Sequence, residues 1–418
     1  MSTSLPHSFA LDVAARRLSL DPRDPTFVQD PYPAYTAIQA VASMVYWEQL
    51  GQWCVFRYED VDQLLRDRRF GREILHLTTR DALGWPDPPA HTRDFDAVDA
   101  HSLLEREPPT HTRLRSLINR AFGPRRVAQL RPAIEALAHA LIDDFPSTPF
   151  DLIEAYATPI PVRIIARLLG VPEAMAPQLL AWSHRMVAMY GVGRTQAVEE
   201  DANAAAAEFS AWLRDLVAER RHAPGDDLLS LLIAAEDGGA RLSEPELVST
   251  AILLLNAGHE ATVHALGNAV HAALTQCDAA ERMDLVRDEG QVARFVEEAL
   301  RYRPPLHLFK RYVLEPLTWD GVDLPQGAQI AVLLGAAGRD PRANVDPHRF
   351  DPTRVRPAHV SFGAGIHYCV GAPLARLELQ VALQTLFQRC PTLALADVPR
   401  VQDSWHFHGL ERLLVTRG

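Results

Sequence analysis

The residue with the clearest chemical potential is Cys369, which lies in a glycine-rich segment far from any other cysteine. Gly363, Gly365 and Gly371 permit a tight loop and a close approach of the backbone to a flat or bulky group. We expect a helix to begin near Cys369, where backbone N–H groups and the helix dipole stabilise a thiolate. A lone thiolate of this kind suits either a nucleophile or a single axial ligand of a metal.

A second group of chemically capable residues lies in the middle of a long predicted helix. Ser243 and Glu246 have the spacing of a capping box, and no strong helix breaker follows until about Gln276. A helix of roughly 30 residues is nearly three times the average length, so we expect it to cross the molecule. Its centre holds a glycine, a carboxylate and a hydroxyl, and such conflicts with helix propensity often mark functional sites. These residues are Gly258, Glu260 and Thr262.

The elements that must position these residues are mainly helices, with a small β component. Two alternating segments, Val45–Trp47 and Trp53–Phe56, are separated by Gly51 and predict a β-hairpin. Residues 108–237 follow a helical pattern. The breaker-rich stretch at 71–106 is long for a loop in a compact domain, which is typical of a lid or a binding loop.

Composition and charge exclude several classes of protein. Of the 418 residues, 47% are hydrophobic and 23% are charged, so disordered and collagen-like chains are excluded. The net charge of −11 argues against nucleic acid as the main partner. Four scattered cysteines without a CxxC pair fit neither a zinc ribbon nor a disulfide scaffold. Without a membrane-length apolar run or a visible signal peptide, we expect a cytoplasmic protein with no membrane contact.

The glycine–cysteine segment has a known counterpart. The pattern Phe362-x-x-Gly365-x-x-x-Cys369-x-Gly371 resembles the heme-binding signature of the cytochromes P450. The resemblance runs from about Pro31 to Val415 and implies one P450 domain over residues 1–418, with a flexible N-terminal segment of about residues 1–25. The implied P450 fold is mainly α with a small β region, and its long central helix crosses the molecule over the heme. Cys369 would be the axial thiolate ligand of the iron of heme b, iron protoporphyrin IX.

Further motif matches support the resemblance. Glu298 and Arg301 resemble the E-x-x-R pair of the family, whose side chains share one helix face. In the family this pair is structural and is completed by a loop arginine, and Arg349 stands at the matching place. The resemblance also implies ligands for the heme propionates, because arginine binds carboxylates bidentately. These ligands are His111, Arg115, Arg311 and His367.

The long helix departs from the family at one position. The family delivers protons for O2 activation through an acid–alcohol pair in the pattern A-G-x-(D/E)-T. Ala257, Gly258 and Glu260 match, and Gly258 is expected to leave room for oxygen. The expected threonine is replaced by Ala261, and the hydroxyl follows at Thr262, turned by about 100° around the helix. Three explanations stay open: a water held by Glu260 and Thr262 delivers protons, a substrate hydroxyl does so, or coupling is poor.

The resemblance also assigns a substrate pocket. Three of its residues are polar, and this suggests a substrate with at least one polar group, because buried polar groups need partners. The alternative is that these polar residues bond only to backbone or water. The assigned residues are Leu253, Asn256, Ala257, Leu306, His307, His406 and Phe407.

Electrons are expected to come from a separate protein, because no GxGxxG motif for a flavin or nicotinamide cofactor occurs. In the soluble bacterial members of the family the donor is usually a ferredoxin with its reductase. We expect a monomer with a local basic patch for this acidic carrier, although an ordinary solvated arginine face is the alternative. The patch would consist of Arg113, Arg120, Arg125, Arg126 and Arg376.

The sequence as a whole therefore predicts a heme-thiolate monooxygenase. It would insert one oxygen atom of O2 into a small organic substrate by hydroxylation, dealkylation or epoxidation. The alternatives are a peroxide-using P450, a cysteine hydrolase that uses Cys369, and a heme-binding sensor without turnover. The hydrolase has no need of Arg115 and Arg311. The sensor explains neither the Gly258 and Glu260 pair nor the long loop.

Overall fold

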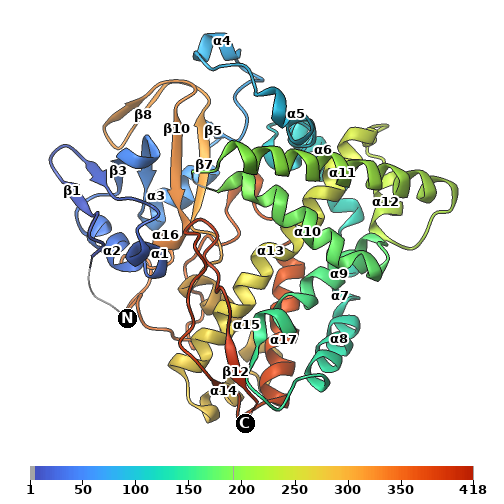
Figure 1. The fold of residues 1–418 in the computed structure, drawn as a ribbon. Coiled ribbons are helices and arrows are strands. Elements are labelled where there is room, and N and C mark those ends of the chain that lie inside the picture. The colour runs from blue at the N-terminus through green and yellow to red at the C-terminus, as the bar shows by residue number, and fades with distance from the viewer. Residues whose placement is uncertain (1–4, 192, 418) are drawn as a thin grey trace. The chain divides into compact units, whose positions relative to one another are not determined.

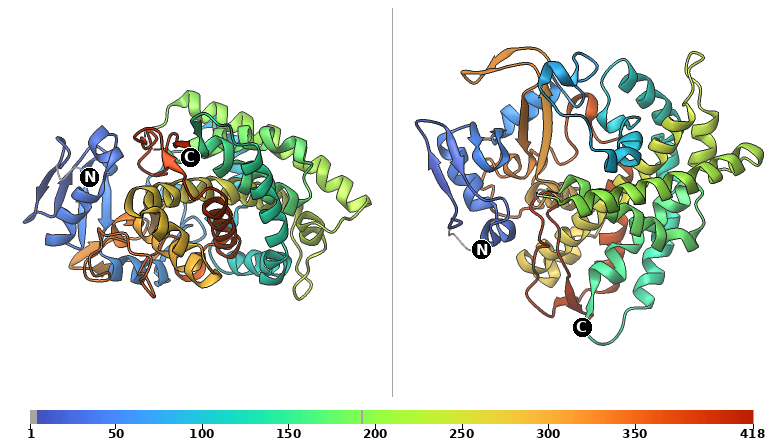
Figure 2. Two further views of the ribbon diagram at one scale, coloured as in Figure 1. Left: turned by 90° about the horizontal axis from the view of Figure 1, so that it is seen from below. Right: turned by 45° about the horizontal axis from the view of Figure 1, so that its top comes forward.

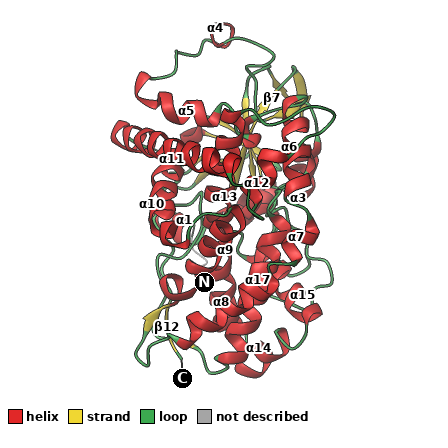
Figure 3. Cartoon of the chain, turned by 90° about the vertical axis from the view of Figure 1, so that its right-hand side faces the viewer, coloured by secondary structure: helices red, strands yellow, loops and turns green. Residues whose placement is uncertain are grey.

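The computed structural model describes residues 5–191 and 193–417. The chain forms two compact units, and each is assembled from segments that are distant in the sequence. The first, called the sheet unit here, comprises Met1–Gly71, Ile134–Pro159 and Ala261–Gly418. The second, called the helical unit, comprises Arg72–Ala133 and Ile160–Glu260. Figure 1 labels the elements along the chain, and Figure 3 shows that most of them are helices, in agreement with the predicted fold class.

The sheet unit contains a seven-stranded sheet in the order β1-β2-β3-β4-β10-β7-β5. Strands β3 and β4 form the predicted antiparallel hairpin around Gly51, and β10 joins β4 in parallel and β7 in antiparallel register. The blue N-terminal strands and the orange β7 and β10 therefore lie side by side, as Figure 2 shows. The strands are β1 (Ala10–Asp12), β2 (Arg17–Ser19), β3 (Met44–Trp47), β4 (Gln52–Val55), β5 (Phe70–Gly71), β7 (Leu308–Val313) and β10 (Gln329–Leu333).

The N-terminal segment differs from the prediction. Residues 10–19, expected to belong to a flexible segment, form strands β1 and β2, and β2 continues the sheet by pairing with β3. The alternation of this short segment was too brief to be recognised as strand, and its pairing partner lies more than 25 residues away in the sequence.

Smaller sheets and helices complete the sheet unit. A three-stranded sheet has the order β11-β12-β6, and β8 pairs with β9. These strands are β6 (Phe150–Asp151), β8 (Leu317–Trp319), β9 (Val322–Leu324), β11 (Ala394–Leu395) and β12 (Leu414–Thr416). The helices are α1 (Pro25–Gln29), α2 (Tyr32–Val41), α3 (Tyr58–Arg66), α14 (Ala279–Leu285), α15 (Glu289–Tyr302), α16 (Leu334–Ala337) and α17 (Ala372–Arg389).

The helical unit is built from helices that pack on one another, with α10 on α11 and α11 on α5. Its helices are α4 (Arg80–Leu83), α5 (Arg93–Asp99), α6 (Thr110–Ala121), α7 (Pro124–Ala128), α10 (Ala176–Val187), α11 (Gln196–His222) and α12 (Leu228–Ala234). Three further helices contain a boundary between the units: α8 (Arg131–Asp143), α9 (Pro159–Leu169) and α13 (Glu244–Gln276).

Helix α13 confirms the predicted long helix, with 33 residues. Both halves of the capping box form at its start. The Ser243 N–H donates to Glu246 Oε2 at 2.8 Å, and the Glu246 N–H donates to Ser243 Oγ at 3.5 Å. Within the described residues, no helix combines the length and apolarity that crossing a membrane requires.

An aromatic cluster forms the core beneath β3. Trp405 from the C-terminal segment contacts Phe27 and Trp47, with ring centroids 5.4 and 5.0 Å apart. The Trp405 indole N–H donates to the Tyr35 hydroxyl at 2.6 Å, which lies 2.9 Å from His307 Nδ1. The indole and hydroxyl groups are thus satisfied inside the core, as buried polar groups require.

His307 and His408 form a stacked pair inside this unit, with centroids 4.4 Å apart. Both residues are fully buried. Burial lowers the pKa of His408 to about 3 and that of His307 well below its ordinary value, with neighbouring positive charges adding to both shifts. The folded chain therefore keeps both rings neutral well below pH 6.5, whereas the unfolded chain protonates them.

Acidification should consequently destabilise the fold. Between pH 7 and pH 5 His408 alone should lower the free energy of unfolding by about 2 kcal/mol, because only the unfolded state binds its proton in this range. The variant His408→Phe keeps a stacking ring but cannot titrate, so its urea midpoint should fall less on acidification than that of the wild type. The exposed His222→Phe is the control. An unchanged pH dependence in His408→Phe would contradict this assignment.

Candidate active site

The Cys369 loop lies in the sheet unit directly before α17. The Cys369 N–H donates to the Phe362 carbonyl at 2.9 Å and closes the loop. Gly365 has φ +69°, and a Cβ there would overlap the Leu65 carbonyl oxygen, so only glycine fits this turn. Helix α17 begins at Ala372 with Gly371 as its N-cap, which confirms the predicted helix start close to the cysteine.

Cys369 differs from the other cysteines in exposure. Cys54 and Cys390 are buried and Cys277 is half-buried, whereas Cys369 is exposed. Burial raises the pKa of the Cys277 thiol to about 11 and also raises the pKa values of Cys54 and Cys390. Those three thiols are therefore poor nucleophiles and poor metal ligands, and the structure presents only Cys369 for such chemistry.

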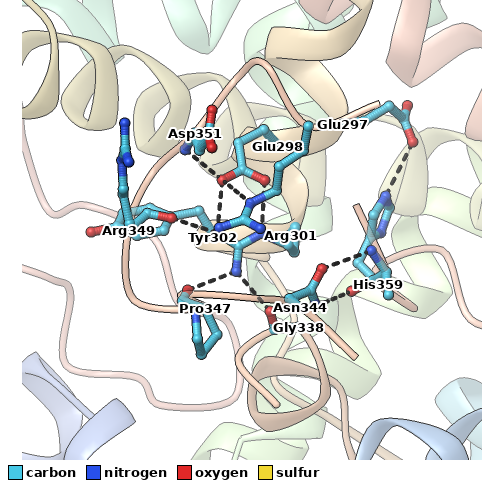
Figure 4. A network of polar contacts seen from close by, with 12 residues as sticks. Glu297, Glu298, Arg301, Tyr302, Gly338, Asn344, Pro347, Arg349, Asp351 and His359 are labelled. Carbon is cyan, nitrogen blue, oxygen red and sulfur yellow. Dashed lines mark hydrogen bonds and ion pairs between the residues drawn. The ribbon is translucent and has the colours of Figure 1, made fainter. Parts of the chain in front are cut away.

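A buried ion pair supports the segment before this loop (Figure 4). Glu298 and Arg301 on α15 are both fully inaccessible, and Arg301 Nε and Nη2 each lie 2.7 Å from a Glu298 oxygen. Arg301 Nη1 donates to the carbonyls of Gly338 and Pro347, both at 2.8 Å. The E-x-x-R pair predicted from the sequence is present, and it ties α15 to the loop that leads toward the cysteine.

The third side chain of this network is that of Arg354, and the expectation of Arg349 is wrong. Arg349 is exposed and offers only its backbone carbonyl, which accepts from Arg301 Nη2 at 3.0 Å. Arg354 Nε lies 3.4 Å from Glu298 Oε1, which also accepts the Asp351 N–H at 2.7 Å. Spacing along the loop does not decide between two nearby arginines, because the choice depends on how the loop turns after Asp351.

A second ion-pair cluster braces the cysteine loop itself. Arg376 on α17 binds Glu297 bidentately at 2.6 and 3.0 Å, and His359 Nε2 lies 3.1 Å from the same carboxylate. Burial acts to raise the pKa of Glu297, but hydrogen bonds from His359 and Arg376 lower it to about 2. The Arg376 guanidinium also lies 4.4 Å from the Phe362 ring centroid. Sequence reasoning missed Glu297 and His359, since neither stands in a recognisable motif.

The predicted propionate ligands are divided between the two units. Arg311 lies on β7 in the sheet unit and is buried, with its guanidinium over the Phe309 ring. His367 lies in the 3-10 turn Gly365–His367 of the same unit. His111 and Arg115 lie one turn apart on α6 in the helical unit, as their spacing predicted, and His111 is buried.

One face of α13 remains accessible around the predicted acid. The residues that share this face recur with helical spacing and are half-buried or exposed, whereas Leu254, Leu255 and His259 between them are buried. We call this the open face of α13. It consists of Leu253, Asn256, Ala257, Glu260 and Ala261.

The structure corrects the role expected for Gly258 and limits that of Thr262. A Cβ at Gly258 would lie 3.0 Å from Ile165 of α9, so the glycine allows close helix packing and leaves no added room for oxygen. Thr262 is buried and lies about 100° around the helix from Ala261. Its hydroxyl therefore does not lie on the open face, whereas Glu260 and Ala261 do.

The pocket residues predicted in the sheet unit come from two adjoining segments. Leu306 and Phe407 form an antiparallel bridge, and the His307 N–H donates to the His406 carbonyl at 3.1 Å. The half-buried His406 packs edge-on against Phe407. The expectation that His307 lines the pocket is wrong, because its ring is fully buried between Tyr35 and His408.

Comparison with known proteins identifies the family to which this chain belongs. Residues 291–408 match the family model described as cytochrome P450. The chain is 37% identical over 390 residues to the cytochrome P450 monooxygenase PikC of Streptomyces venezuelae, which covers 91% of this chain and 88% of that protein. The chain belongs to the cytochrome P450 family. It is a P450 monooxygenase, an enzyme, and the family implies a bound heme.

Other members of the family extend the comparison. The vitamin D(3) 25-hydroxylase of Pseudonocardia autotrophica is 38% identical over 401 residues, which cover 94% of this chain and 95% of the relative. The solved structure of P450BioI, in complex with an acyl carrier protein ligated to hexadec-9Z-enoic acid, has a TM-score of 0.86 and 33% identity. That match covers 94% of this chain and 99% of the P450BioI chain.

The residues of this P450 fit a heme. Cys369 is exposed, and the loop that carries it packs directly against the Leu65 backbone at Gly365, so its thiol is accessible and its loop is held in place, as a single axial ligand needs. Arg311, a permanent cation, is buried in the same unit, and its planar guanidinium suits a carboxylate such as a heme propionate. Cys369 would hold the iron and Arg311 a propionate.

The arginines proposed for a basic docking patch are mostly neutralised. In the helical unit Arg113 pairs with Glu246, Arg120 with Asp237 and Arg126 with Asp226. In the sheet unit Arg376 is held by Glu297. Of the five arginines, only the exposed Arg125 has no carboxylate partner within the described residues. The prediction of a patch of uncompensated positive charges is therefore wrong, because four of its five arginines are paired with carboxylates.

The correction from Arg349 to Arg354 can be tested directly. Arg354→Ala removes one partner of the fully buried Glu298 and should lower the free energy of unfolding by about 1–3 kcal/mol. Arg349→Ala keeps the backbone carbonyl that accepts from Arg301. It should change the free energy of unfolding by less than about 0.5 kcal/mol. Urea unfolding of both variants measures the difference. Equal losses, or a larger loss in Arg349→Ala, would refute the assignment.

Proposed function

We propose that this P450 binds heme b through Cys369 and inserts one oxygen atom of O2 into a small organic substrate. The observation that supports this most strongly is the exposed Cys369 at the start of α17, in a loop braced by the Glu297 and Glu298 networks. Heme bound through a thiolate supplies an electron-rich iron centre for O2 activation. We further propose Arg311, His367, His111 and Arg115 as the residues that hold the propionates.

The electrons would come from a ferredoxin and its reductase. The reason is that the sequence carries no GxGxxG motif for a flavin or nicotinamide cofactor. We expect the enzyme to act as a monomer in the cytoplasm. A peroxide-using reaction of the same enzyme is the competing function, and it needs no protein donor.

Glu260 would carry the proton. Its carboxylate lies on the open face of α13, while Thr262 is buried on another side of the helix. This arrangement favours a proton route from Glu260 through water or a substrate hydroxyl over one that needs the Thr262 hydroxyl. The proton would move from the Glu260 carboxyl toward the reacting oxygen, and the carboxylate would be reprotonated from solvent.

The substrate is proposed to be mainly apolar with at least one hydrogen-bonding group. Leu253, Ala257, Leu306 and Phe407 offer apolar contacts. Asn256 offers a polar one, since its Oδ1 is buried and has no hydrogen-bond partner in the described part of the chain. Relatives named for hydroxylating vitamin D(3) and 6-deoxyerythronolide B support a substrate of this kind. His406 is the second candidate for a polar contact.

Isotope labelling distinguishes the O2-dependent monooxygenase from the peroxide-using enzyme. A substrate candidate is first found by a spectral screen for compounds that displace water from the iron. The enzyme is then given this compound with labelled O2, ferredoxin, reductase and reduced nicotinamide. The product should contain one labelled oxygen atom, and Cys369→Ser should form none. Product that forms only with added peroxide would favour the peroxygenase, and tight binding of every screened compound without any product would favour a sensor.

The departure at Ala261 predicts a change in coupling. Because residue 261 lies on the open face beside Glu260, Ala261→Thr places a hydroxyl near the proposed proton route. We expect the ratio of product formed to electrons consumed to change by about twofold or more, since a positioned proton-transfer group typically contributes about a hundredfold to ten-thousandfold to a rate. Heme content should be unaffected. The control is Thr262→Val, which alters a buried hydroxyl away from this face and should leave the ratio unchanged. Equal ratios in Ala261→Thr and wild type would remove position 261 from the mechanism.

A further inference from the structure

Three side chains that commonly bind metal ions meet in the helical unit. His184 lies near the end of α10, and His259 and Glu260 lie in the middle of α13. The Nε2 atom of each histidine is 3.7 Å from Glu260 Oε2, and the two imidazole centroids are 6.3 Å apart. One ligand atom from each residue lies within 4.8 Å of the other two, and no second group of this kind occurs among the described residues.

The separations approach those of a zinc site. In tetrahedral coordination with bonds of about 2.0–2.2 Å to nitrogen and oxygen, neighbouring ligand atoms lie about 3.4 Å apart. Both histidine–carboxylate distances are within a few tenths of an ångström of this value. The ligand nitrogens of His184 and His259 lie within 4.8 Å of each other. They can move closer by rotation of the His184 side chain, which is 58% exposed. The same exposure gives an ion a path from solvent.

The orientation of His259 is already that of a metal ligand. Its Nδ1 lies 2.7 Å from the Leu255 carbonyl oxygen, to which an Nδ1–H donates. This tautomer places the lone pair on Nε2, the atom near Glu260, and a second hydrogen bond of this kind usually fixes metal-binding histidines. Asn256 Nδ2 and Met186 Sδ, 3.6 Å apart, form another contact between the same two helices. The Nε2 atom of His259 is therefore oriented for a metal ion before one arrives.

We propose that His184, His259 and Glu260 bind one Zn²⁺ ion, with water completing the coordination. Two imidazoles and a carboxylate form a donor set that suits zinc, and three protein ligands leave one position open. The ion links α10 to α13 and holds the Glu260 carboxylate as a ligand, so that Glu260 no longer transfers protons. This inhibition rests on the proposed function of Glu260, whereas the binding of Zn²⁺ does not.

Calorimetric titration of the heme-loaded enzyme with zinc chloride tests the site. We expect one ion per chain, and His184→Ala should weaken binding by at least about tenfold, since even loss of an outer-shell partner costs that much. His184→Cys should retain binding, because a thiolate is also a zinc ligand. His222→Ala, which removes an exposed histidine of α11, is the matched control and should bind as the wild type does. Absence of a one-to-one site, or equal affinity in His184→Ala and wild type, would overturn the proposal.

Turnover measured with and without Zn²⁺ distinguishes the site from its consequence. Wild type should lose activity over the concentration range in which the site fills, and His184→Ala should resist. If Zn²⁺ binds through His184 and turnover is unchanged, the proton role of Glu260 fails while the metal site stands. If Zn²⁺ inhibits both proteins equally, the inhibition arises elsewhere and the regulatory role is overturned.

Discussion

The structure around Cys369 depends on the buried ion pair between Glu298 and Arg301. Removing two charges from water costs several kcal/mol for each ion unless hydrogen bonds replace the lost solvation. Arg301 obtains them from three backbone carbonyls between residues 338 and 349, and Glu298 from backbone and side chain of residues 351–354. The segment 338–354 must therefore keep its course around the Glu298–Arg301 ion pair. The pair thus determines geometry more than it adds net stability.

This constraint extends from the ion pair to the cysteine through the chain that follows. The Leu300 carbonyl, next to Arg301, accepts the Ser361 hydroxyl at 2.8 Å. Glu297, next to Glu298, binds Arg376 on α17. The segment that carries Cys369 is consequently fixed at both ends to the same turn of α15. An exposed cysteine in a loop fixed at both ends suits an axial metal ligand, because a mobile side chain would not hold one axial geometry.

Local features of this chain could be predicted from its sequence, whereas features that depend on distant residues could not. The capping box at Ser243 and the helix start near Cys369 are encoded within a few residues, and both are present. The choice of Arg354 over Arg349 depends on loop conformation. The burial of His307 and the packing of Gly258 on Ile165 depend on contacts with residues far away in the sequence. No spacing rule along one segment contains that information.

The proposed function requires Cys369 to be the thiolate ligand of a heme, and the absorption spectrum of the reduced protein with carbon monoxide tests this most directly. A thiolate ligand gives an intense band shifted strongly to the red of the band that an imidazole ligand gives. We predict the red-shifted band in freshly prepared wild type and its loss in Cys369→Ser. An imidazole-type spectrum in folded, freshly prepared wild type, or an unchanged spectrum in Cys369→Ser, would contradict the account.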